Sequence, residues 1–390
     1  MATPPADFDP YPALSTDCAP RAAYFHVPFC FHRCGYCDFT LVAERDDLIP
    51  AWFVALENEL SRLSQSYEVD SIFIGGGTPT HLTVPQLTQL IELIGESFTL
   101  VDGGECSIEA NPDGLDNDRL NALADLGVNR ISLGVQSFDA AVLKTLERHH
   151  TATEAVDVVE RASERFSNVS LDLIFGVPGL TFDCWRDSLQ MAISLPLQHV
   201  STYGLTFEKG TDFFQRRKKG ELLSVSDDVE RDMYAAAIDD TSNAGFRHYE
   251  VSNFAKPGFE CQHNMVYWSA DEYFAFGPGA ARYVAGTRST NSRNVVRWIN
   301  RWSQNEVALQ ESECLNSDER IREDVFLGLR LVDGIDLQSF QDRFDTDLLQ
   351  YAHAAITKHM ADGYLEVVDE RLRLTREGRF VADWVVSDFL

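Results

Sequence analysis

Short apolar runs alternate with amphipathic stretches over the first half of the chain. From about residue 22, the runs that read as strands are 22–27, 71–74, 107–110, 130–133, 170–174 and 199–205. Between them, stretches such as 48–63 and 84–98 have the periodicity of amphipathic helices. Strands separated by helices predict parallel βα units, because parallel strands need a crossover connection. We therefore predict an α/β fold, a partial TIM-like (βα)6 barrel, with an open doubly wound sheet as the alternative.

The alternation fades beyond about residue 210. An aromatic, glycine-rich segment extends to Tyr283, and after residue 316 two helical stretches precede a hairpin and a further helix. This order resembles a small winged-helix-like module. We expect a division of the chain into an N-terminal tail at 1–21, a barrel core at 22–210, an extension at 211–315 and a C-terminal domain at 316–390.

Composition narrows the class of protein. The chain has 390 residues, of which 44% are hydrophobic and 24% charged, as is typical of a protein with a well-formed core. Its longest apolar stretches are far short of the roughly 18 residues that a membrane span requires, and its start lacks the features of a signal peptide. The net charge of −28 opposes contact with nucleic acid or anionic lipid. Eight scattered cysteines suit a reducing compartment. We expect a cytoplasmic protein that meets a membrane only through a partner and binds no nucleic acid.

Unusual residues follow the predicted strands. A cysteine-rich loop comes after the first strand and Gly75-Gly-Gly-Thr-Pro-Thr80 after the second, and Glu109 and Gln136 lie at the ends of the third and fourth. Asp172 lies in the fifth strand. In a barrel of parallel strands the carboxyl ends all meet at one face, where reactive groups gather. These residues are therefore predicted to share one mouth.

Cys30, Cys34 and Cys37 have the spacing C-x3-C-x2-C. Three thiolates on one short loop can hold three irons of a cubane iron–sulfur cluster, which leaves the fourth iron open to a non-protein ligand. The spacing alone also permits zinc, with His26 or His32 as the fourth ligand. An electron-transfer cluster completed by a distant cysteine is a further alternative.

The segment GGGTPT lacks the lysine of a phosphate-binding loop. Its glycines let backbone groups approach a ligand closely, although a tight strand-to-helix turn would require them equally. Beside the cysteine loop, this backbone could hold the amino group of an amino-acid-like ligand. Glu109, Gln136, Arg148 and Asp172 could contact its sugar and carboxylate, but each taken singly is more often a salt bridge or a cap.

Taken together, these motifs resemble those of radical S-adenosylmethionine (SAM) proteins, in the group that contains oxygen-independent coproporphyrinogen III oxidase and the HemW-type haem chaperones. The resemblance extends over about residues 22–385. It implies a [4Fe–4S] cluster on Cys30, Cys34 and Cys37, with SAM chelating the open iron and being cleaved to a 5′-deoxyadenosyl radical. The SAM contacts that it implies are Tyr24, Tyr36, Gly76, Gly77, Thr78, Glu109, Gln136, Arg148, Asp172 and Gly204.

Two features separate the branches of this group. The pattern of the decarboxylating oxidases is C-x3-C-x2-C-x-C, preceded by a long N-terminal segment. In this chain, Phe39 occupies the position of the extra cysteine and 29 residues precede Cys30. Residues 263–268 read HNMVYW and match the H-N-x-x-Y-W signature of the chaperones, where it is linked to haem. An imidazole can ligate haem iron and aromatic rings can pack on a porphyrin. The haem contacts that the resemblance implies are His263, Asn264, Tyr267 and Trp268, with a buried structural histidine as the alternative for His263.

The resemblance favours a haem chaperone that binds haem, the cluster and SAM, and passes haem to respiratory or other haem proteins without catalytic residues of its own. The alternative is the oxidase of porphyrin biosynthesis, which converts two propionates of coproporphyrinogen III to vinyl groups. A third is a zinc-stabilised TIM-like binding protein. The sequence leaves open whether SAM is cleaved productively and whether the chain forms a homodimer.

Overall fold

The computed structural model describes residues 9–15 and 19–390; residues 1–8 and 16–18 of the predicted N-terminal tail lie outside the described residues. All six predicted strands are present, each parallel to the next. They are β1 (Ala22–Val27), β4 (Tyr67–Gly76), β5 (Phe98–Ala110), β6 (Arg130–Gln136), β7 (Asn168–Phe175) and β8 (His199–Gly204). The predicted α/β fold with six parallel βα strands is confirmed.

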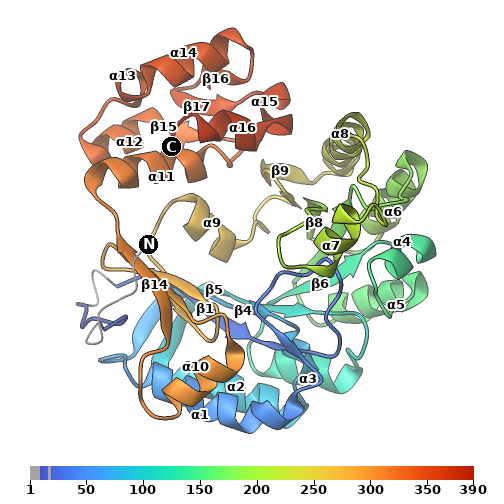
Figure 1. Ribbon diagram of the computed structural model, residues 1–390, viewed down its shortest axis with the longest axis vertical. Helices are drawn as coiled ribbons and strands as arrows, with labels where there is room; N and C mark the ends of the chain where they lie inside the picture. The colour runs from blue at the N-terminus through green and yellow to red at the C-terminus, as the bar shows by residue number, and fades with distance from the viewer. Residues whose placement is uncertain (1–8, 16–18) are drawn as a thin grey trace.

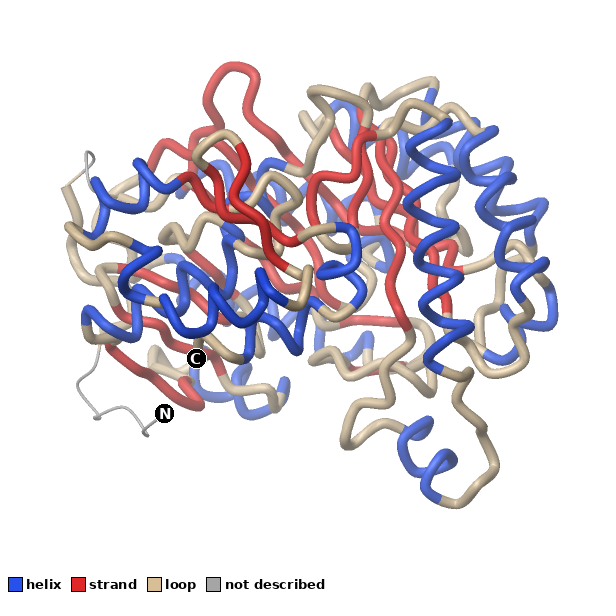
Figure 2. Tube along the Cα trace, turned by 90° about the horizontal axis from the view of Figure 1, so that it is seen from above, coloured by secondary structure: helices blue, strands red, loops and turns tan. Residues whose placement is uncertain are grey.

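Helices connect these strands and flank them in Figure 2. Their apolar residues recur every three or four positions, as Leu87, Leu90 and Ile94 do in the second helix, so one side of each helix is buried. The helices are α1 (Ile49–Leu60), α2 (Val84–Ser97), α3 (Asn117–Asp125), α4 (Ala140–Thr145), α5 (Ala152–Ser163) and α6 (Phe182–Ser194). Shorter elements in this half are β2 (Phe29–Cys30), β3 (Val42–Ala43) and the 3-10 turns η2 (Asp46–Leu48) and η3 (Pro79–His81).

The order of the strands distinguishes the two predicted architectures. The 9-stranded sheet has the order β11-β1-β4-β5-β6-β7-β8-β10-β9. From β1 to β8 this order follows the chain, so the sheet winds in one direction, as in a barrel. A doubly wound sheet reverses its order at a switch point, and no reversal occurs among β1 to β8. The sheet is thus a partial barrel whose edge strands are β11 and β9.

The segment after residue 210 adds strands to both edges of this sheet. β10 pairs antiparallel with β8, β9 pairs antiparallel with β10, and β11 lies parallel to β1. The elements are α7 (Asp212–Lys218), α8 (Asp227–Asn243), β9 (Arg247–Glu250), β10 (Asn253–Ala255), α9 (Gln262–Trp268), β11 (Phe274–Phe276), β12 (Ala281–Val284), β13 (Thr287–Asn291), α10 (Val295–Trp302) and β14 (Leu309–Cys314). The sequence did not reveal these edge strands, because runs of three or four residues are too short to show an alternating pattern.

The C-terminal elements enclose a hydrophobic core of their own, which includes Val325, Phe340, Leu372 and Val385. Their helix–helix–hairpin order is the predicted winged-helix-like one, and the hairpin turns through residues 369 and 370. The elements are α11 (Ser317–Gly328), β15 (Ile335–Asp336), α12 (Leu337–Phe344), α13 (Leu348–Tyr351), α14 (His353–Ala361), β16 (Leu365–Val368), β17 (Arg371–Leu374), α15 (Arg376–Phe380) and α16 (Ala382–Ser387). Figure 1 shows α9 between these elements and the strands of the main sheet, and α9 contacts both β4 and α11. In the described part of the chain, no helix is both long and apolar enough to cross a membrane.

A buried ion pair fastens the later segment to the first helix. Glu59 of α1 and Arg282 of β12 have fully buried side chains, with 3.2 Å between Arg282 Nη2 and Glu59 Oε1. The Tyr11 hydroxyl and the Asn291 amide donate to the same carboxylate oxygen, at 3.0 and 2.7 Å. The Gly277 N–H donates to the other oxygen at 2.8 Å. Each carboxylate oxygen therefore has donors, which offsets much of the cost of burying the charge.

Replacing Arg282 by methionine should destabilise the protein strongly, because it leaves the Glu59 carboxylate buried without its counter-charge. Breaking a buried pair from one side costs about 3–5 kcal/mol. We expect a loss of that size in the free energy of unfolding, measured by urea denaturation. Arg297→Met removes an exposed arginine of α10 and serves as the control. An Arg282→Met protein as stable as this control would contradict the importance of the pair.

Candidate functional site

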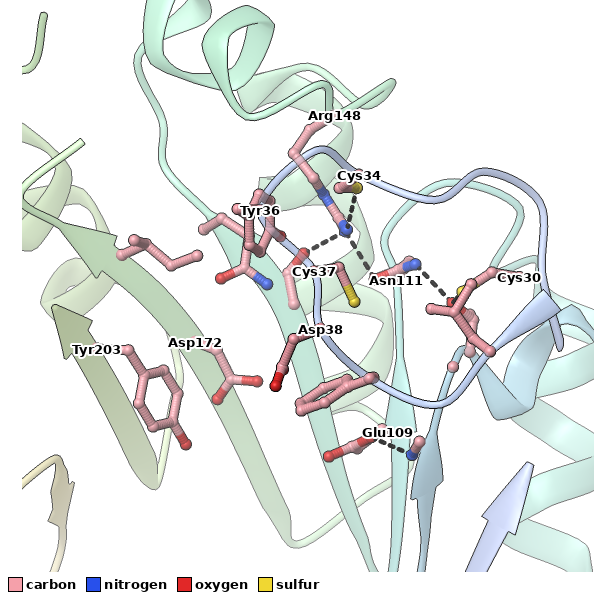
Figure 3. Close-up of a pocket in the computed structure, with 18 of the residues that line it drawn as sticks. Cys30, Cys34, Tyr36, Cys37, Asp38, Glu109, Asn111, Arg148, Asp172 and Tyr203 are labelled. Atoms are coloured by element: carbon pink, nitrogen blue, oxygen red, sulfur yellow. Dashed lines mark hydrogen bonds between the residues drawn. The ribbon is translucent and has the colours of Figure 1, made fainter. Parts of the chain in front are cut away.

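A cavity of about 340 Å³ opens at the carboxyl ends of the parallel strands, where the strand-end residues were predicted to meet. Figure 3 shows the cysteine loop on one side of it and the ends of the strands on the other. The predicted residues that line this cavity are Cys30, Cys34, Tyr36, Cys37, Gly76, Gly77, Thr78, Glu109, Gln136, Arg148, Asp172 and Gly204. The structure thus brings the predicted cluster ligands and all but one of the predicted SAM contacts to one place. Tyr24 lines an adjoining cavity instead.

Contacts with other segments of the chain fix the conformation of the cysteine loop. At its base, β2 and β3 pair in parallel and close the two ends of the loop. In its middle, the Gly35 N–H donates to Glu147 Oε2 at 2.8 Å. A Cβ atom at Gly35 would lie 2.8 Å from the Phe213 ring, so the loop presses closely on α7. Glu147 and Phe213 come from a loop and a helix far along the chain, and no pattern in the sequence marked them.

The three cysteines line the cavity, with Cys30 buried and Cys34 and Cys37 half-buried. Burial raises the pKa of each, and that of Cys30 to about 11. Cys30 Sγ lies 3.0 Å from the Thr78 hydroxyl, and Arg148 Nη1 lies 4.0 Å from Cys34 Sγ. These thiols are therefore protonated at neutral pH, and binding of a metal centre would release their protons.

An all-thiol donor set on one loop fits an iron–sulfur cluster. Among the described residues, no three His, Cys, Asp or Glu side chains converge closely enough to ligate a single metal ion. A cubane cluster does not need such convergence, because each thiolate binds a different iron. Both histidines considered as zinc ligands have other partners. His26 Nε2 donates to the Thr40 carbonyl at 2.6 Å, and His32 Nε2 lies 3.4 Å from a carboxylate oxygen of Glu147.

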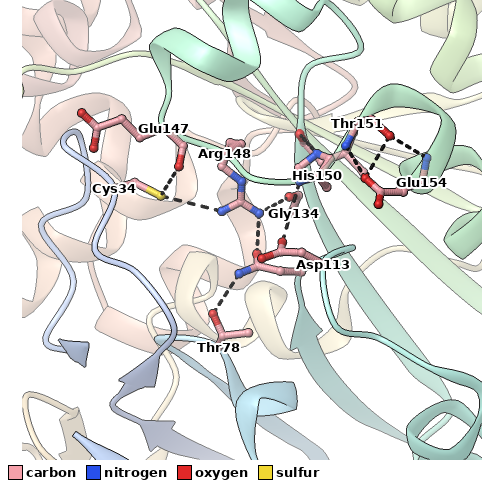
Figure 4. Close-up of polar contacts among 11 residues, drawn as sticks. Cys34, Thr78, Asp113, Gly134, Glu147, Arg148, His150, Thr151 and Glu154 are labelled. Atoms are coloured by element: carbon pink, nitrogen blue, oxygen red, sulfur yellow. Dashed lines mark hydrogen bonds and ion pairs between the residues drawn. The ribbon is translucent and has the colours of Figure 1, made fainter. Parts of the chain in front are cut away.

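Arg148 connects the cysteine loop to two strand ends. Its Nη2 donates to Asn111 Oδ1 at 2.6 Å, after β5, and to the Gly134 carbonyl at 2.7 Å, in β6. Its Nη1 faces Cys34 Sγ, and Figure 4 shows these contacts spreading from one guanidinium. Asn111 in turn donates to the Thr78 hydroxyl at 2.9 Å. A single buried cation therefore orders three neighbouring segments of the cavity wall.

The glycines after β4 are explained by close packing. The N–H groups of Gly76, Gly77 and Thr78 donate to Glu109 Oε2, the Val27 carbonyl and the Phe29 carbonyl, each at 2.8 Å. Gly76 has a φ of 115°, and a Cβ atom at Gly77 would lie 2.7 Å from the Phe29 oxygen. The tight-turn interpretation therefore accounts for these glycines. An amino group is itself a donor, so it would meet the carbonyl oxygens of this turn, not its N–H groups.

Two carboxyl groups lie opposite the cysteine loop. Burial raises the pKa of Glu109 to about 7, an effect that the Gly76 N–H offsets in part and that nearby Asp172 increases. Burial also raises the pKa of Asp172, although the Ser132 hydroxyl, at 3.2 Å, stabilises its charged form. Gln136 reaches the same cavity from a bulge in β6, where its φ is 68°. The cavity thus offers carboxyl oxygens and the Gln136 amide to a polar ligand.

The predicted haem contacts do not line this cavity. His263, Asn264 and Tyr267 line an adjoining cavity of about 200 Å³, together with Tyr24, Glu109 and Asp172. The Trp268 ring packs instead against the guanidinium of Arg330, in the turn after α11, 5.7 Å from the ring centroid. The motif is therefore divided between the two sides of α9, with one part toward the sheet and the other toward the C-terminal elements.

Both ring nitrogens of His263 have partners. Nδ1 lies 3.0 Å from the Ser71 hydroxyl and Nε2 lies 2.8 Å from the Tyr267 hydroxyl, while the ring stacks on Phe73. The side chain is 1% exposed, and burial lowers its pKa to about 3, so the imidazole is neutral. This geometry suits a buried structural histidine. Ligation of iron by Nε2 would require the Tyr267 hydrogen bond to break.

Several residues of the cavity wall were not singled out from the sequence. Asn111 lines the cavity from the segment after β5, Ser132 from β6 and Tyr203 from β8. The rule that functional residues follow parallel strands applies to Asn111 and Tyr203, because each stands at a strand end. Ser132 lies inside β6, and only the inward direction of its side chain places it here. Phe39 occupies the position at which the oxidase pattern has its extra cysteine. It lines the same cavity and is 55% exposed.

Comparison with protein families gives two matches. The Radical SAM superfamily matches residues 24–192, and the HemN C-terminal domain matches residues 315–381. Among solved structures, the coproporphyrinogen III oxidase HemN of Escherichia coli superimposes with a TM-score of 0.84 over 95% of this chain and 90% of its own. Its sequence is 23% identical, so this similarity supports the fold alone.

Full-length relatives are more similar in sequence. The haem chaperone HemW of Lactococcus lactis is 38% identical over 95% of this chain and 97% of its own length. The haem chaperone HemW of Bacillus subtilis is 35% identical over 95% and 99%. A mouse mitochondrial protein, radical S-adenosyl methionine domain-containing protein 1, is 33% identical over 95% and 87%.

The raised pKa of Glu109 predicts a pH dependence of stability. The folded protein holds a proton on Glu109 up to about pH 7, whereas the unfolded chain loses it near the ordinary glutamate pKa of 4.5. Stability from this group is therefore lost as pH rises through that window. Between about pH 6 and 8, the wild type should lose about 1 kcal/mol more unfolding free energy than Glu109→Gln.

Urea denaturation of the ligand-free proteins at both pH values measures this difference. Glu92→Gln, which changes an exposed carboxylate of α2, is the matched control and should follow the wild type. If Glu109→Gln shows the same pH dependence as the wild type, Glu109 is already ionised in the folded protein.

Proposed function

This chain belongs to the HemW family of radical SAM proteins, and we propose that it is a haem chaperone that binds haem and delivers it to acceptor haem proteins. The observation that carries the proposal is sequence similarity to haem chaperones along nearly the whole chain. Phe39, in place of the extra cysteine of the oxidase pattern, supports the same choice. The oxidase alternative finds support only from a similarity of fold.

The radical SAM family implies a [4Fe–4S] cluster and SAM as cofactors. We propose that Cys30, Cys34 and Cys37 hold the cluster, because their thiols line one cavity on a loop fixed by its surroundings. When bound, the cluster supplies an electron donor beside SAM. Loss of the three thiol protons on binding is favoured by the nearby positive charge of Arg148.

We propose that the strand-end residues bind and orient SAM. The carbonyl oxygens of the turn at Gly76 and Gly77 would accept hydrogen bonds from its amino group. Glu109 and Asp172 would accept hydrogen bonds from the hydroxyl groups of its ribose, because both carboxyls lie on the wall opposite the cysteines. Arg148 has its Nη2 engaged by Asn111 and Gly134, so it acts mainly by positioning these segments.

We further propose that the protein works in the cytoplasm and that its acceptors include respiratory haem proteins. The net charge of −28 disfavours direct contact with anionic lipid, so an acceptor at a membrane would be reached through protein–protein contact. Homodimer formation remains a prediction.

The proposed function predicts haem binding without decarboxylation. After anaerobic reconstitution of the cluster, haem titration followed by absorption should reach one haem per chain. With SAM, a reductant and coproporphyrinogen III, the same preparation should form no protoporphyrinogen. The oxidase of E. coli, assayed in parallel, shows that the conditions support the reaction. Product formation over many turnovers would refute the chaperone as the main role.

Cys34→Ser should abolish assembly of the cluster, because it replaces one of three thiolate ligands. Iron and sulfide content and visible absorption after reconstitution measure the loss, and SAM binding by calorimetry should fall with them. Cys314→Ser alters an exposed cysteine at the end of β14 and should leave all three measurements unchanged. Full cluster content in Cys34→Ser would exclude Cys34 as a ligand.

A further inference from the structure

We propose that haem binds in a second groove beside the cysteine loop, with His149 as a ligand of the iron. This inference rests on the proposed haem chaperone function and assigns a site to it. The groove has a volume of about 350 Å³. Its lining includes Phe31, His32, His81, Arg119 and His149. It adjoins the SAM cavity, with which it shares Cys30, His32, Cys34, Thr78, Asn111 and Arg148, whereas Cys37 lines the SAM cavity alone.

His149 is the imidazole best placed to bind iron. Its side chain is exposed, and the described residues offer its ring nitrogens no hydrogen-bond partner. The other imidazoles near the groove are engaged, because His81 Nε2 lies 2.7 Å from Asp46 Oδ1 and His32 Nε2 lies 3.4 Å from Glu147 Oε2. His263 uses both ring nitrogens and is 1% exposed. An imidazole with a free nitrogen in an open groove can ligate haem iron without first losing a bond.

Phe31 supplies an apolar surface beside this imidazole. Its ring is 68% exposed, although it lies on a loop whose neighbouring segments are tightly held. The ring planes of Phe31 and His149 are at 88°, with their centroids 6.2 Å apart. His32 is also nearly perpendicular to His149, at 81° and 5.2 Å.

These angles permit a porphyrin to stack on the loop. An imidazole that ligates iron through its ring nitrogen stands perpendicular to the porphyrin plane. A porphyrin on His149 can therefore lie parallel to the Phe31 and His32 rings and pack against their faces. Covering Phe31 would also remove an exposed aromatic side chain from water.

The charges around the groove accommodate the propionates of haem. Arg119 lines it and is partly neutralised by Asp116, with 2.6 Å between Nη1 and Oδ2. Two acidic residues also line the groove, but both are engaged. Glu147 accepts from the Gly35 N–H and contacts Arg216, and Asp113 lies 3.8 Å from His150 Nδ1. The Arg119 Nε also donates to the Leu82 carbonyl at 3.3 Å, so its Nη2 is left to donate a charge-assisted hydrogen bond to one propionate.

The site suits a carrier because it is open. A haem held by one exposed histidine and one aromatic face can pass to an acceptor without unfolding of the barrel. It would also touch residues 31 and 32, which lie between two of the predicted cluster ligands. Haem occupancy and the environment of the cluster would then be coupled through one loop.

The test compares histidine variants of the full-length, cluster-reconstituted protein under anaerobic conditions. His149→Ala should weaken haem binding at least tenfold and change the absorption spectrum of bound haem. Added imidazole should restore the wild-type spectrum, which a purely structural defect would not allow. His353→Ala changes an exposed histidine of α14 and should bind haem as the wild type does. Phe31→Ser should weaken binding without changing the spectrum, since it leaves the iron ligand in place.

The outcomes separate this site from the proposed function. If the wild type binds no haem, the proposed function itself fails. If the wild type binds haem and His149→Ala binds it equally, with an unchanged spectrum, the site proposed here is wrong while the chaperone role stands. Loss of binding in His263→Ala, with His149→Ala unaffected, would move the ligand to the HNMVYW motif. Unchanged iron and sulfide content in His149→Ala excludes an indirect effect through the cluster.

Discussion

The burial of one guanidinium organises the cofactor site. Arg148 contacts the Cys34 thiol, the Asn111 side chain and the Gly134 carbonyl. It therefore joins the cysteine loop to the segment after β5 and to β6. The loop has little regular structure of its own, and a cluster ligand set needs its thiols in a fixed arrangement. Charge-assisted hydrogen bonds from the guanidinium to neutral acceptors are strong enough to fix that arrangement. It also places positive charge where thiolates would form.

Around this centre, the later part of the chain closes the partial barrel. The Glu59–Arg282 pair ties β12 to α1, and β11 adds to the edge of β1. α9 is held at its start by Glu105, whose carboxylate accepts from the Gln262 N–H at 2.9 Å. Its HNMVYW residues then face both the inner cavity and the C-terminal elements. The motif therefore connects these two parts of the molecule, a role that does not require it to ligate iron.

Much of this arrangement could be predicted from the sequence, and the limits have physical causes. Strand periodicity and the rule that parallel strands end at one face predicted that residues from Cys30 to Asp172 would meet. Contacts between distant side chains were not predictable, as for Glu147 with Gly35, because nothing local encodes them. The short strands β9 to β11 were missed because their pairing depends on tertiary contacts. The resemblance to haem chaperones drew attention to His263, whereas only the structure showed that both of its nitrogens have partners and that those of His149 have none among the described residues.

The central claim is that this protein hands haem to other proteins, and the most direct measurement is the rate of that transfer. Haem-loaded protein would be mixed with an apo-form respiratory haem protein, and the rate compared with passive release to an unrelated apo-globin. The account predicts transfer to the cognate acceptor that is faster than passive release and rises with acceptor concentration. A rate equal to passive release at every acceptor concentration would contradict it.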